Sequence, residues 1–372
     1  MGIKLFLLII FFAVMVGVGF YSRRHVKSVD GFVLGGRSVG PWLTAFAYGT
    51  SYFSAVVFVG YAGQFGWKYG IASTWIGIGN ALIGSLLAWV VLGRRTKVMT
   101  QHLRAKTMPD FFGQRYGSKA LKIVASVIVF VFLIPYTASV YNGLSRLFGM
   151  AFNIPYKYCV IGMAVFTGIY VILGGYMATA INDFIQGIIM LGGIVAVIAA
   201  VLSGQGGFIQ AIRQMAEIPS DVAVTAGQPG AFTSFFGPDP LNLLGVVILT
   251  SLGTWGLPQM IGKFYAIKDE KAINTGTVIS TLFAVVISGG CYFLGGFGRL
   301  FDNPSIYDAE TGAVVYDSII PYMLSTLPDI LIGIVVVLVL SASMSTLSSL
   351  VLTSSSTMTL DLLKDNIMKE MS

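Results

Sequence analysis

Residues 341 to 357 read Ser-Ala-Ser-Met-Ser-Thr-Leu-Ser-Ser-Leu-Val-Leu-Thr-Ser-Ser-Ser-Thr, a run dense in hydroxyl groups. The run continues directly from the apolar stretch 330–340, so its hydroxyls are expected at membrane depth. On a helix, positions i, i+3, i+4 and i+7 share a face. That face contains Ala342, Ser345, Thr346 and Ser349, and Ser348 lies at its edge. So many neutral oxygens on one face predict a site for a hard cation.

The composition places the chain in a membrane. Of its 372 residues, 55% are hydrophobic and 10% are charged, and a mean hydropathy of +0.81 excludes a soluble globular domain. A helix needs about 20 apolar residues to cross a bilayer. Such windows lie at roughly 3–21, 42–64, 71–93, 121–149, 156–174, 178–203, 241–262, 274–298 and 329–357. The sequence predicts an all-α polytopic membrane protein with about nine helices in a single transmembrane domain over residues 1–372.

The charge of the loops predicts the orientation of the chain. Lys and Arg gather in three loops, 23–37, 94–115 and 263–271, and the last of these begins with Lys263. The loops between them are acidic or neutral. Because loops rich in Lys and Arg stay in the cytoplasm, the N-terminus is expected outside the plasma membrane and the C-terminus inside. This asymmetry explains the net charge of +7, so membrane lipid is an expected partner and nucleic acid is not.

Two of the predicted spans are interrupted by small residues. Residues 47–54 read Ala-Tyr-Gly-Thr-Ser-Tyr-Phe-Ser, and residues 251–258 read Ser-Leu-Gly-Thr-Trp-Gly-Leu-Pro. Glycine tolerates unwound backbone, and Pro258 removes a backbone donor. In a bilayer, exposed carbonyls persist only where they line a cavity or bind a ligand. Two matched interruptions predict an inverted-repeat transporter with its site near the midplane, although glycine and proline also serve packing in membrane helices.

Five short blocks, spread over nearly the whole chain, form a specific set. They are Leu34-Gly35-Gly36-Arg37-Ser38, Trp75-Ile76-Gly77-Ile78-Gly79, Thr107-Met108-Pro109-Asp110-Phe111-Phe112, Gly174-Gly175 with Asp183 and Gln186, and Met344-Ser345-Thr346-Leu347-Ser348. Together they resemble the sodium/solute symporter family, particularly its bacterial sodium/proline branch. The resemblance implies a leucine-transporter-type core, an inverted repeat of five plus five helices, preceded by one extra N-terminal helix. It implies sodium-driven uptake of a small organic solute by alternating access and no enzymatic activity.

In that architecture the extra helix is 3–21, the first repeat is about 42–203, and a partial second repeat is about 241–357, before a cytoplasmic tail at 358–372. Only three helices of the second repeat are expected, so the sequence predicts a C-terminally truncated chain. Two alternatives therefore stay open, an inactive fragment and a sodium-binding sensor or channel-like protein. No phosphate-binding loop of the form G-x-x-x-x-G-K-[ST] occurs, which leaves ATP-driven pumping without support.

The resemblance also implies a main sodium (Na+) site made of five oxygens. These belong to the backbone of Thr50, Phe53 and Ala342 and to the hydroxyls of Ser345 and Thr346. The implied site agrees with the hydroxyl face of residues 341–357, because a hard monovalent cation prefers several neutral oxygens. The competing interpretation is that these hydroxyls bond back to their own helix or join helices together.

Asp183 is an ionisable residue inside a predicted span, which is costly and by default functional. At about 1.5 Å per residue, it should lie roughly 9 Å from the cytoplasmic end. Some members of the family have a second sodium site, at the positions of Asp183, Ser345, Ser348 and Ser349. The alternative is that Asp183 pairs with a Lys or Arg near the helix mouth. Arg37 is expected as a cytoplasmic anchor, or in an inner-gate ion pair with Asp110 or Asp183.

The organic solute is expected between the two interrupted helices. Tyr136 and Pro258 match residues of the proline branch, although Tyr136 could serve packing alone and Pro258 the kink. Two departures put proline itself in doubt, because Tyr52 replaces an aspartate of that branch and Thr250 and Thr254 replace aromatic residues. The candidate substrate-binding residues are Tyr52, Tyr136, Thr254, Trp255 and Pro258. An amino acid such as proline or a monocarboxylate is the first expectation, and a sugar or a pantothenate-like acid stays open.

Overall fold

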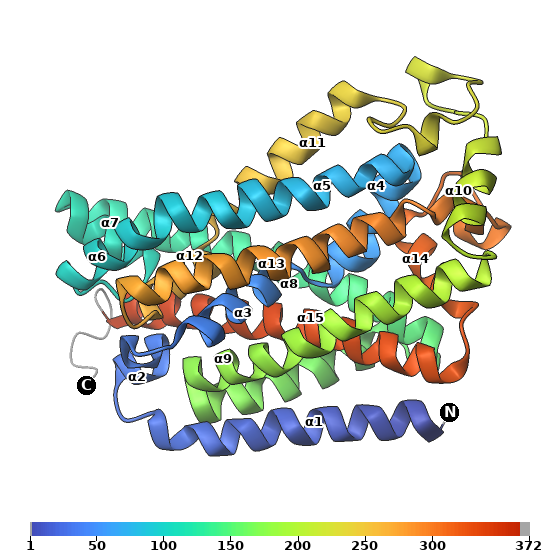
Figure 1. The fold of residues 1–372 in the computed structure, drawn as a ribbon. Helices are drawn as coiled ribbons and strands as arrows, with labels where there is room; N and C mark the ends of the chain where they lie inside the picture. Colours follow the sequence, from blue (N-terminus) through green and yellow to red (C-terminus); the bar gives the residue numbers. More distant parts are fainter. Residues whose placement is uncertain (1, 365–372) are drawn as a thin grey trace.

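The computed structural model describes residues 2–364, and in this range the chain is almost entirely helical (Figure 1). The helices are α1 (Gly2–Ser22), α2 (Val29–Leu34), α3 (Pro41–Tyr52), α4 (Ala62–Tyr69), α5 (Thr74–Gly79), α6 (Arg94–His102), α7 (Met108–Tyr116), α8 (Lys119–Phe152), α9 (Tyr156–Gly204), α10 (Phe208–Glu217), α11 (Pro240–Leu252), α12 (Pro258–Ala266), α13 (Glu270–Gly295), α14 (Tyr316–Ser325) and α15 (Asp329–Ser356). Wider helical turns at Val56–Tyr61, Asn80–Leu87, Trp89–Gly93 and Thr357–Lys364 continue their neighbours. The predicted all-α class is confirmed.

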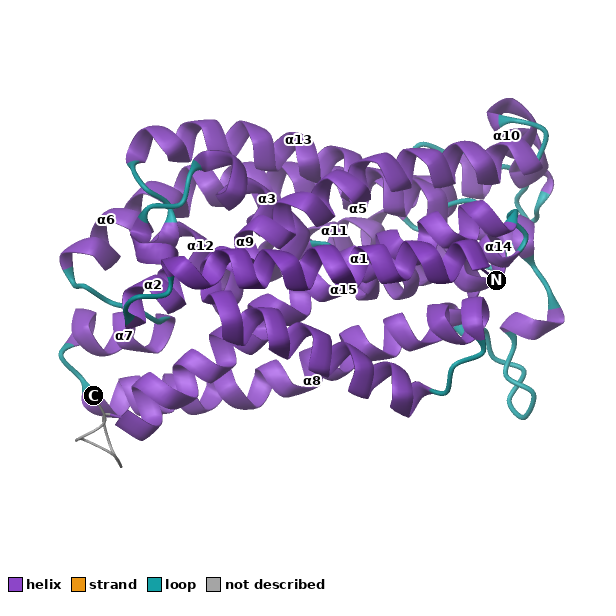
Figure 2. Ribbon diagram, turned by 90° about the horizontal axis from the view of Figure 1, so that it is seen from below, coloured by secondary structure: helices purple, strands orange, loops and turns teal. Residues whose placement is uncertain are grey.

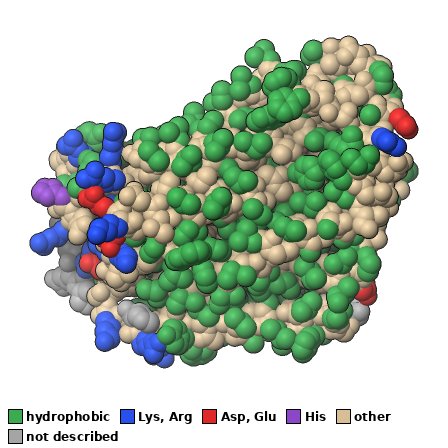
Figure 3. Space-filling model, in the orientation of Figure 1, with side chains coloured by type: hydrophobic (Ala, Val, Ile, Leu, Met, Phe, Trp, Pro, Cys, Tyr) green, Lys and Arg blue, Asp and Glu red, His purple; other side chains and the backbone are tan. Residues whose placement is uncertain are grey.

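The long helices lie side by side along one direction, and α1 begins at the end of the bundle opposite to that where α15 finishes (Figures 1 and 2). Within residues 2–364, six helices are long and apolar enough to cross a membrane, or seven when the bent pair Pro240–Gly256 and Pro258–Ala266 counts as one. Hydrophobic side chains cover the middle of the visible face, and Lys and Arg gather around α6 and α7 (Figure 3). We call this the basic end. The chain is an integral membrane protein.

Two glycines reverse the direction of the chain with the same backbone conformation. Gly70 has φ 59° and ψ −142°, and Gly175 has φ 51° and ψ −142°, a region open only to glycine. Around Gly175, Tyr170 packs on Gly19 of α1 while Asn182 donates to the carbonyl of Met15, one turn away on the same helix. A straight helix would separate Tyr170 and Asn182 by about 18 Å. α9 is therefore a hairpin of two antiparallel helices.

Both predicted interruptions are present. α3 ends at Tyr52, and Phe53 leaves the helical conformation with φ −105° and ψ 86°. The Ser54 hydroxyl then accepts from the Val56 N–H and starts the next helical segment. In the second interruption, a short turn at Gly253–Gly256 precedes Pro258, which takes the first position of α12, where no N–H is needed. The axis bends by 53° there.

The hydroxyl-rich part of α15 faces protein on every side. Each residue from Ser341 to Leu350 is buried, because α15 packs against both arms of α9 and against α1, α3 and α8. Within Ser341–Leu350 no lipid-facing position is left for the hydroxyls, so they bond either to carbonyls of their own helix or to neighbouring helices.

A very close helix contact joins α4 to α13, and it predicts a large effect of one methyl group. A Cβ on Gly66 would lie within 2.1 Å of the carbonyl group of Gly295, so Gly66→Ala should force the helices apart and destabilise the fold by about 1–3 kcal/mol. The measurement is the melting temperature of the purified protein in detergent.

The matched control is Gly192→Ala, in a helix position with no neighbour within 4 Å. Because alanine favours helix over glycine by up to about 1 kcal/mol, this variant should melt at the same or a slightly higher temperature. Equal melting of the two variants would contradict the packing described for α4 and α13.

Candidate functional site

Four oxygens from two distant parts of the chain meet at the first interruption. The Ser345 hydroxyl donates to the Thr50 carbonyl at 2.9 Å and to the Ala342 carbonyl at 3.2 Å. The Thr346 hydroxyl lies 3.5 Å from the Thr50 carbonyl and 3.1 Å from that of Ala342. All four residues are at most 1% exposed. The hydroxyls thus contact their own helix and also join α15 to α3.

The local sequence explains why these oxygens are available. The last carbonyls of a helix have no donor within it, and ending α3 at Tyr52 places Thr50 among them. On α15, Ala342, Ser345 and Thr346 share the face that packs on this helix end. Phe53 lies beside them, because Phe53 and Ala342 line the same small void of about 10 Å³.

The chemistry and spacing of these four oxygens fit the ligands of a sodium ion. Sodium has nearly the radius of calcium, whose oxygen ligands lie about 2.3–2.6 Å from the ion, so neighbouring ligands stand roughly 3.3–3.6 Å apart. The observed oxygen separations of 2.9–3.5 Å approach this spacing and need only a small expansion. All four oxygens are uncharged, as expected of the ligands of a monovalent ion. The ligand assignment itself stays a prediction.

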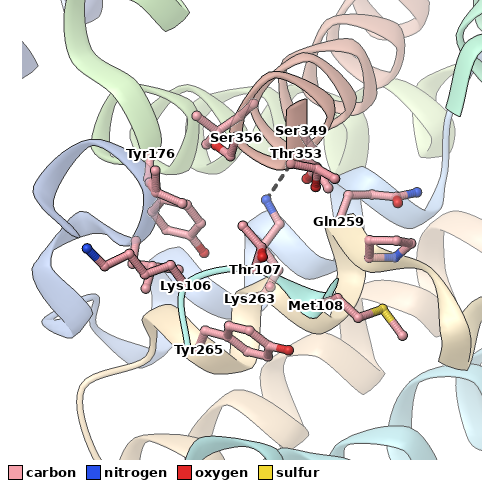
Figure 4. Close-up of a pocket in the computed structure, with 16 residues that line it drawn as sticks. Lys106, Thr107, Met108, Tyr176, Gln259, Lys263, Tyr265, Ser349, Thr353 and Ser356 are labelled. Atoms are coloured by element: carbon pink, nitrogen blue, oxygen red, sulfur yellow. Dashed lines mark hydrogen bonds between the residues drawn. The ribbon is translucent and has the colours of Figure 1, made fainter. Parts of the chain in front are cut away.

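Asp183 faces a lysine. Its Oδ2 lies 3.7 Å from Lys263 Nζ, and both side chains are buried, with 0% and 3% exposure. Lys263 Nζ also donates to the Ser349 hydroxyl at 2.9 Å, and that hydroxyl lies 2.9 Å from the hydroxyl of Ser51. Figure 4 shows the Lys263 side chain reaching from α12 toward α15, with the bond to Ser349 dashed. Ser348 instead donates to the Ser345 carbonyl at 2.9 Å.

One prediction about a charged residue is wrong. Lys263 was expected in a cytoplasmic loop, but Pro258 starts a new helix that continues to Ala266 and carries Lys263 into the protein. Arg37 was expected as a cytoplasmic anchor or in an ion pair with Asp110 or Asp183. The ion pair is not formed, since the Arg37 guanidinium donates to the Ala105 carbonyl at 2.6 Å and each carboxylate faces a lysine.

A larger cavity of about 360 Å³ adjoins the cation cluster and runs between the interrupted helices. Its lining is aromatic, aliphatic, hydroxylic and amide, with no charged side chain. It comprises Tyr52, Ser54, Val56, Val57, Tyr61, Phe65, Asn80, Tyr136, Ser139, Leu249, Thr250, Gly253, Thr254, Leu257 and Tyr292. Such a mixture of apolar walls and a few polar groups is typical of a small-molecule site.

Three of the five candidate substrate residues, Tyr52, Tyr136 and Thr254, line this cavity. Trp255 and Pro258 do not. The Trp255 indole donates to the Ile83 carbonyl at 3.0 Å, and Pro258 lines a cavity of about 50 Å³ at the basic end.

Sequence reasoning missed Asn80, which connects three helices beside the cavity. Its Oδ1 accepts from the Thr250 and Ser251 hydroxyls, both at 3.1 Å, and its Nδ2 donates to Ser288 Oγ at 3.2 Å. A signal was present, because Asn80 is the only amide side chain in the apolar window 71–93.

A network of charged and polar side chains links the helices at the basic end. Lys122 of α8 lies 2.8 Å from Asp110 and 3.2 Å from Asp361, and Thr107 donates to Asp361 at 2.6 Å. Burial opposes the charge on Asp110, yet hydrogen bonds from Lys122, Gln114 and the Lys106 N–H hold the pKa of its carboxyl below the usual value. The Asp110 carboxylate therefore keeps its charge at neutral pH.

A bundle in which two interrupted helices flank a cavity and a cluster of neutral oxygens defines a membrane transporter of the leucine-transporter-type fold. The structure of a Na+-coupled sialic acid symporter, in a substrate-bound outward-open state, matches with a TM-score of 0.79. The match covers 98% of this chain and 74% of that one at 16% identity, which shows the shared fold.

The chain belongs to the sodium:solute symporter family, whose sequence profile matches residues 32–372. Sodium/proline symporter 2 of Staphylococcus saprophyticus subsp. saprophyticus is 31% identical over 367 residues, which are 96% of this chain and 68% of that protein. The sodium/proline symporter of Staphylococcus aureus (strain JH9) is 32% identical, over 95% of this chain and 67% of that protein. The predicted family is confirmed, and the chain spans about two thirds of the length of these relatives.

Removing one oxygen from the cluster should weaken sodium binding. Ser345→Ala takes away the hydroxyl that contacts both Thr50 and Ala342, so sodium affinity should fall about tenfold or more, a change of about 1.4 kcal/mol. The measurement is equilibrium binding of ²²Na+ to purified protein in lipid nanodiscs.

Ser343→Ala is the matched control, because the Ser343 hydroxyl is equally buried but bonds only to the Val339 carbonyl of its own helix. Its sodium affinity should stay within about twofold of the parent. Equal effects of the two substitutions would place the sodium site elsewhere.

Proposed function

We propose that this chain is a sodium-coupled symporter that imports a small organic solute by alternating access. Sodium binds to Thr50, Phe53, Ala342, Ser345 and Thr346, and the solute binds in the adjacent cavity. One observation carries the proposal. Ser54 lines both the solute cavity and the void beside Ala342, so the two sites meet at the same break in the backbone.

The shared break gives a physical basis for coupling. Sodium bound between Thr50 and Ser345 joins α3 to α15. It thereby fixes the backbone from Tyr52 to Ser54, two residues that line the solute cavity. When sodium already holds this part of the cavity wall in place, solute binding loses less conformational entropy in ordering it. Sodium therefore raises the affinity for the solute. By linkage, the solute raises sodium affinity by the same factor.

The cavity lining favours a solute without net charge. With no lysine, arginine or carboxylate on its wall, the cavity lacks a fixed counter-charge for an ion, whereas a zwitterion carries its own. Aromatic side chains such as Tyr52 and Tyr292 suit the apolar part of a small amino acid such as proline, the solute in the names of the staphylococcal relatives. A monocarboxylate paired with the bound sodium is the second candidate.

The basic end is assigned to the cytoplasm. Arg94, Arg95 and Lys106 lie there, and loops rich in Lys and Arg stay on that side. Contacts of Lys122 with Asp110 and Asp361 join the helices at this end. The cavity of about 360 Å³ is lined by Tyr61 and Phe65, which follow the first interruption on the side away from the basic end. This arrangement supports an inward-closed state that receives solute from outside.

The test is uptake of radiolabelled solutes into proteoliposomes with an inward sodium gradient. The panel contains proline, other amino acids, monocarboxylates, pantothenate and sugars. We expect accumulation of proline or another small amino acid that disappears when choline replaces sodium. Accumulation independent of sodium would contradict coupling. Sodium binding without any accumulation would favour the sensor alternative.

Filling the cavity should separate solute binding from sodium binding. Ser139 lines the cavity, so Ser139→Leu should lower solute affinity at least tenfold, about 1.4 kcal/mol, and leave sodium affinity measured without solute within about twofold. Ser145→Leu is the control, since Ser145 is on the same helix with the same type of hydroxyl bond but does not line the cavity. Loss of solute binding in both variants would argue against this cavity.

A further inference from the structure

The second predicted cation position already contains a positive charge from the chain itself. Lys263 Nζ lies 2.9 Å from Ser349 Oγ and 3.7 Å from Asp183 Oδ2, and it stands 5.3 Å above the ring of Tyr176. These contacts give the ammonium a hydroxyl, a carboxylate and an aromatic face. They are the groups that a bound cation would use.

The charges balance when lysine is the only cation. Asp183 contributes one negative charge, and Lys263 contributes one positive charge at ion-pair distance. A sodium ion on Asp183 and Ser349 would stand within a few ångströms of the ammonium, where two like charges in a buried site repel strongly. The tethered ammonium also loses no translational freedom on binding, so free sodium competes with it at a disadvantage.

The hydroxyl oxygens of this position have hydrogen-bond partners as well. The Ser348 hydroxyl donates to the Ser345 carbonyl, and the Ser349 hydroxyl contacts Ser51 in addition to Lys263. The ammonium thus completes a chain of contacts from Asp183 through Ser349 to Ser51, the residue after Thr50.

We propose that the Lys263 ammonium is the resident cation of the second site, so that the protein binds one sodium ion, at the Thr50 and Ser345 site, and none at Asp183. This inference rests on the proposed function, because it assigns the number of coupling ions. Lys263, Ser349 and Tyr176 all line the cavity of about 50 Å³ at the basic end, so the position of the ammonium borders this cavity (Figure 4).

The test counts bound ²²Na+ per chain at saturation in lipid nanodiscs, with no transport required. Lys263→Met keeps the length of the side chain and removes its charge, so it should bind about one more sodium than the parent. The double variant Lys263→Met with Asp183→Asn should lose the extra ion. Lys268→Gln is the charge control, because Lys268 is half exposed and lies two residues after the end of α12, the helix that carries Lys263. It should bind the same number as the parent.

A second readout covers the risk that Lys263→Met unfolds with its carboxylate unpaired. Its melting temperature should rise steeply with sodium, and that of the parent much less. Should it fail to fold at any sodium concentration, Ser348→Ala decides. An unchanged sodium count supports the proposal, and the loss of one ion overturns it, because a sodium ion would then use the Ser348 hydroxyl.

An unchanged count in folded Lys263→Met also overturns the inference. Its failure is distinct from failure of the proposed function, which the parent protein alone decides. A parent that binds no sodium overturns the function. A parent that binds two sodium ions overturns the second-site inference, as does a folded Lys263→Met that binds no more sodium than the parent.

Discussion

The structure depends on one contact, between the broken end of α3 and the hydroxyl face of α15. Ending a helix inside an apolar layer leaves carbonyls without donors, and each buried unpaired group costs about 1–3 kcal/mol. Ser345 supplies a donor to Thr50 at 2.9 Å from a position 295 residues away. The interruption and the hydroxyl run are therefore one feature, because neither is stable at this depth without the other. The oxygens that satisfy each other in this contact are also the oxygens that can surround an ion.

The sequence predicted the features that are encoded locally. Glycines and Pro258 mark the two interruptions within a few residues, and the spacing of Ala342, Ser345 and Thr346 follows from helix geometry alone. The conformation of Gly175 could not be predicted, since glycine pairs are common in membrane helices for packing. Its role becomes clear only from the contacts of Tyr170 and Asn182, which flank Gly175 in α9 and touch adjacent turns of α1.

The candidate site was predictable where it lies on one helix and not where separate helices meet. Asn80 and Thr250 are 170 residues apart, and no local pattern indicates their contact. Trp255 was a reasonable candidate by its place in the interruption, but its indole points to Ile83 on a neighbouring segment. Lys263 was assigned to a loop because the predicted span 241–262 ends one residue before it. Proline at the first position of a helix starts it, and the helix then carries the lysine inward.

Among the polar contacts of α15, three join it to three different helices along its length. Ser345 contacts α3, Ser349 contacts Lys263 of α12, and Asp361, in the turns that continue α15, contacts Lys122 of α8. Opening the basic end must break the contact of Asp361 with Lys122, the one of the three that lies at this end. A buried lysine that keeps Asp183 neutralised during this movement avoids the cost of an unpaired charge at membrane depth. Charge balance at Asp183 then does not depend on the arrival or departure of an ion, which leaves the proposed site at Thr50 and Ser345 as the place where sodium binding would change the conformation.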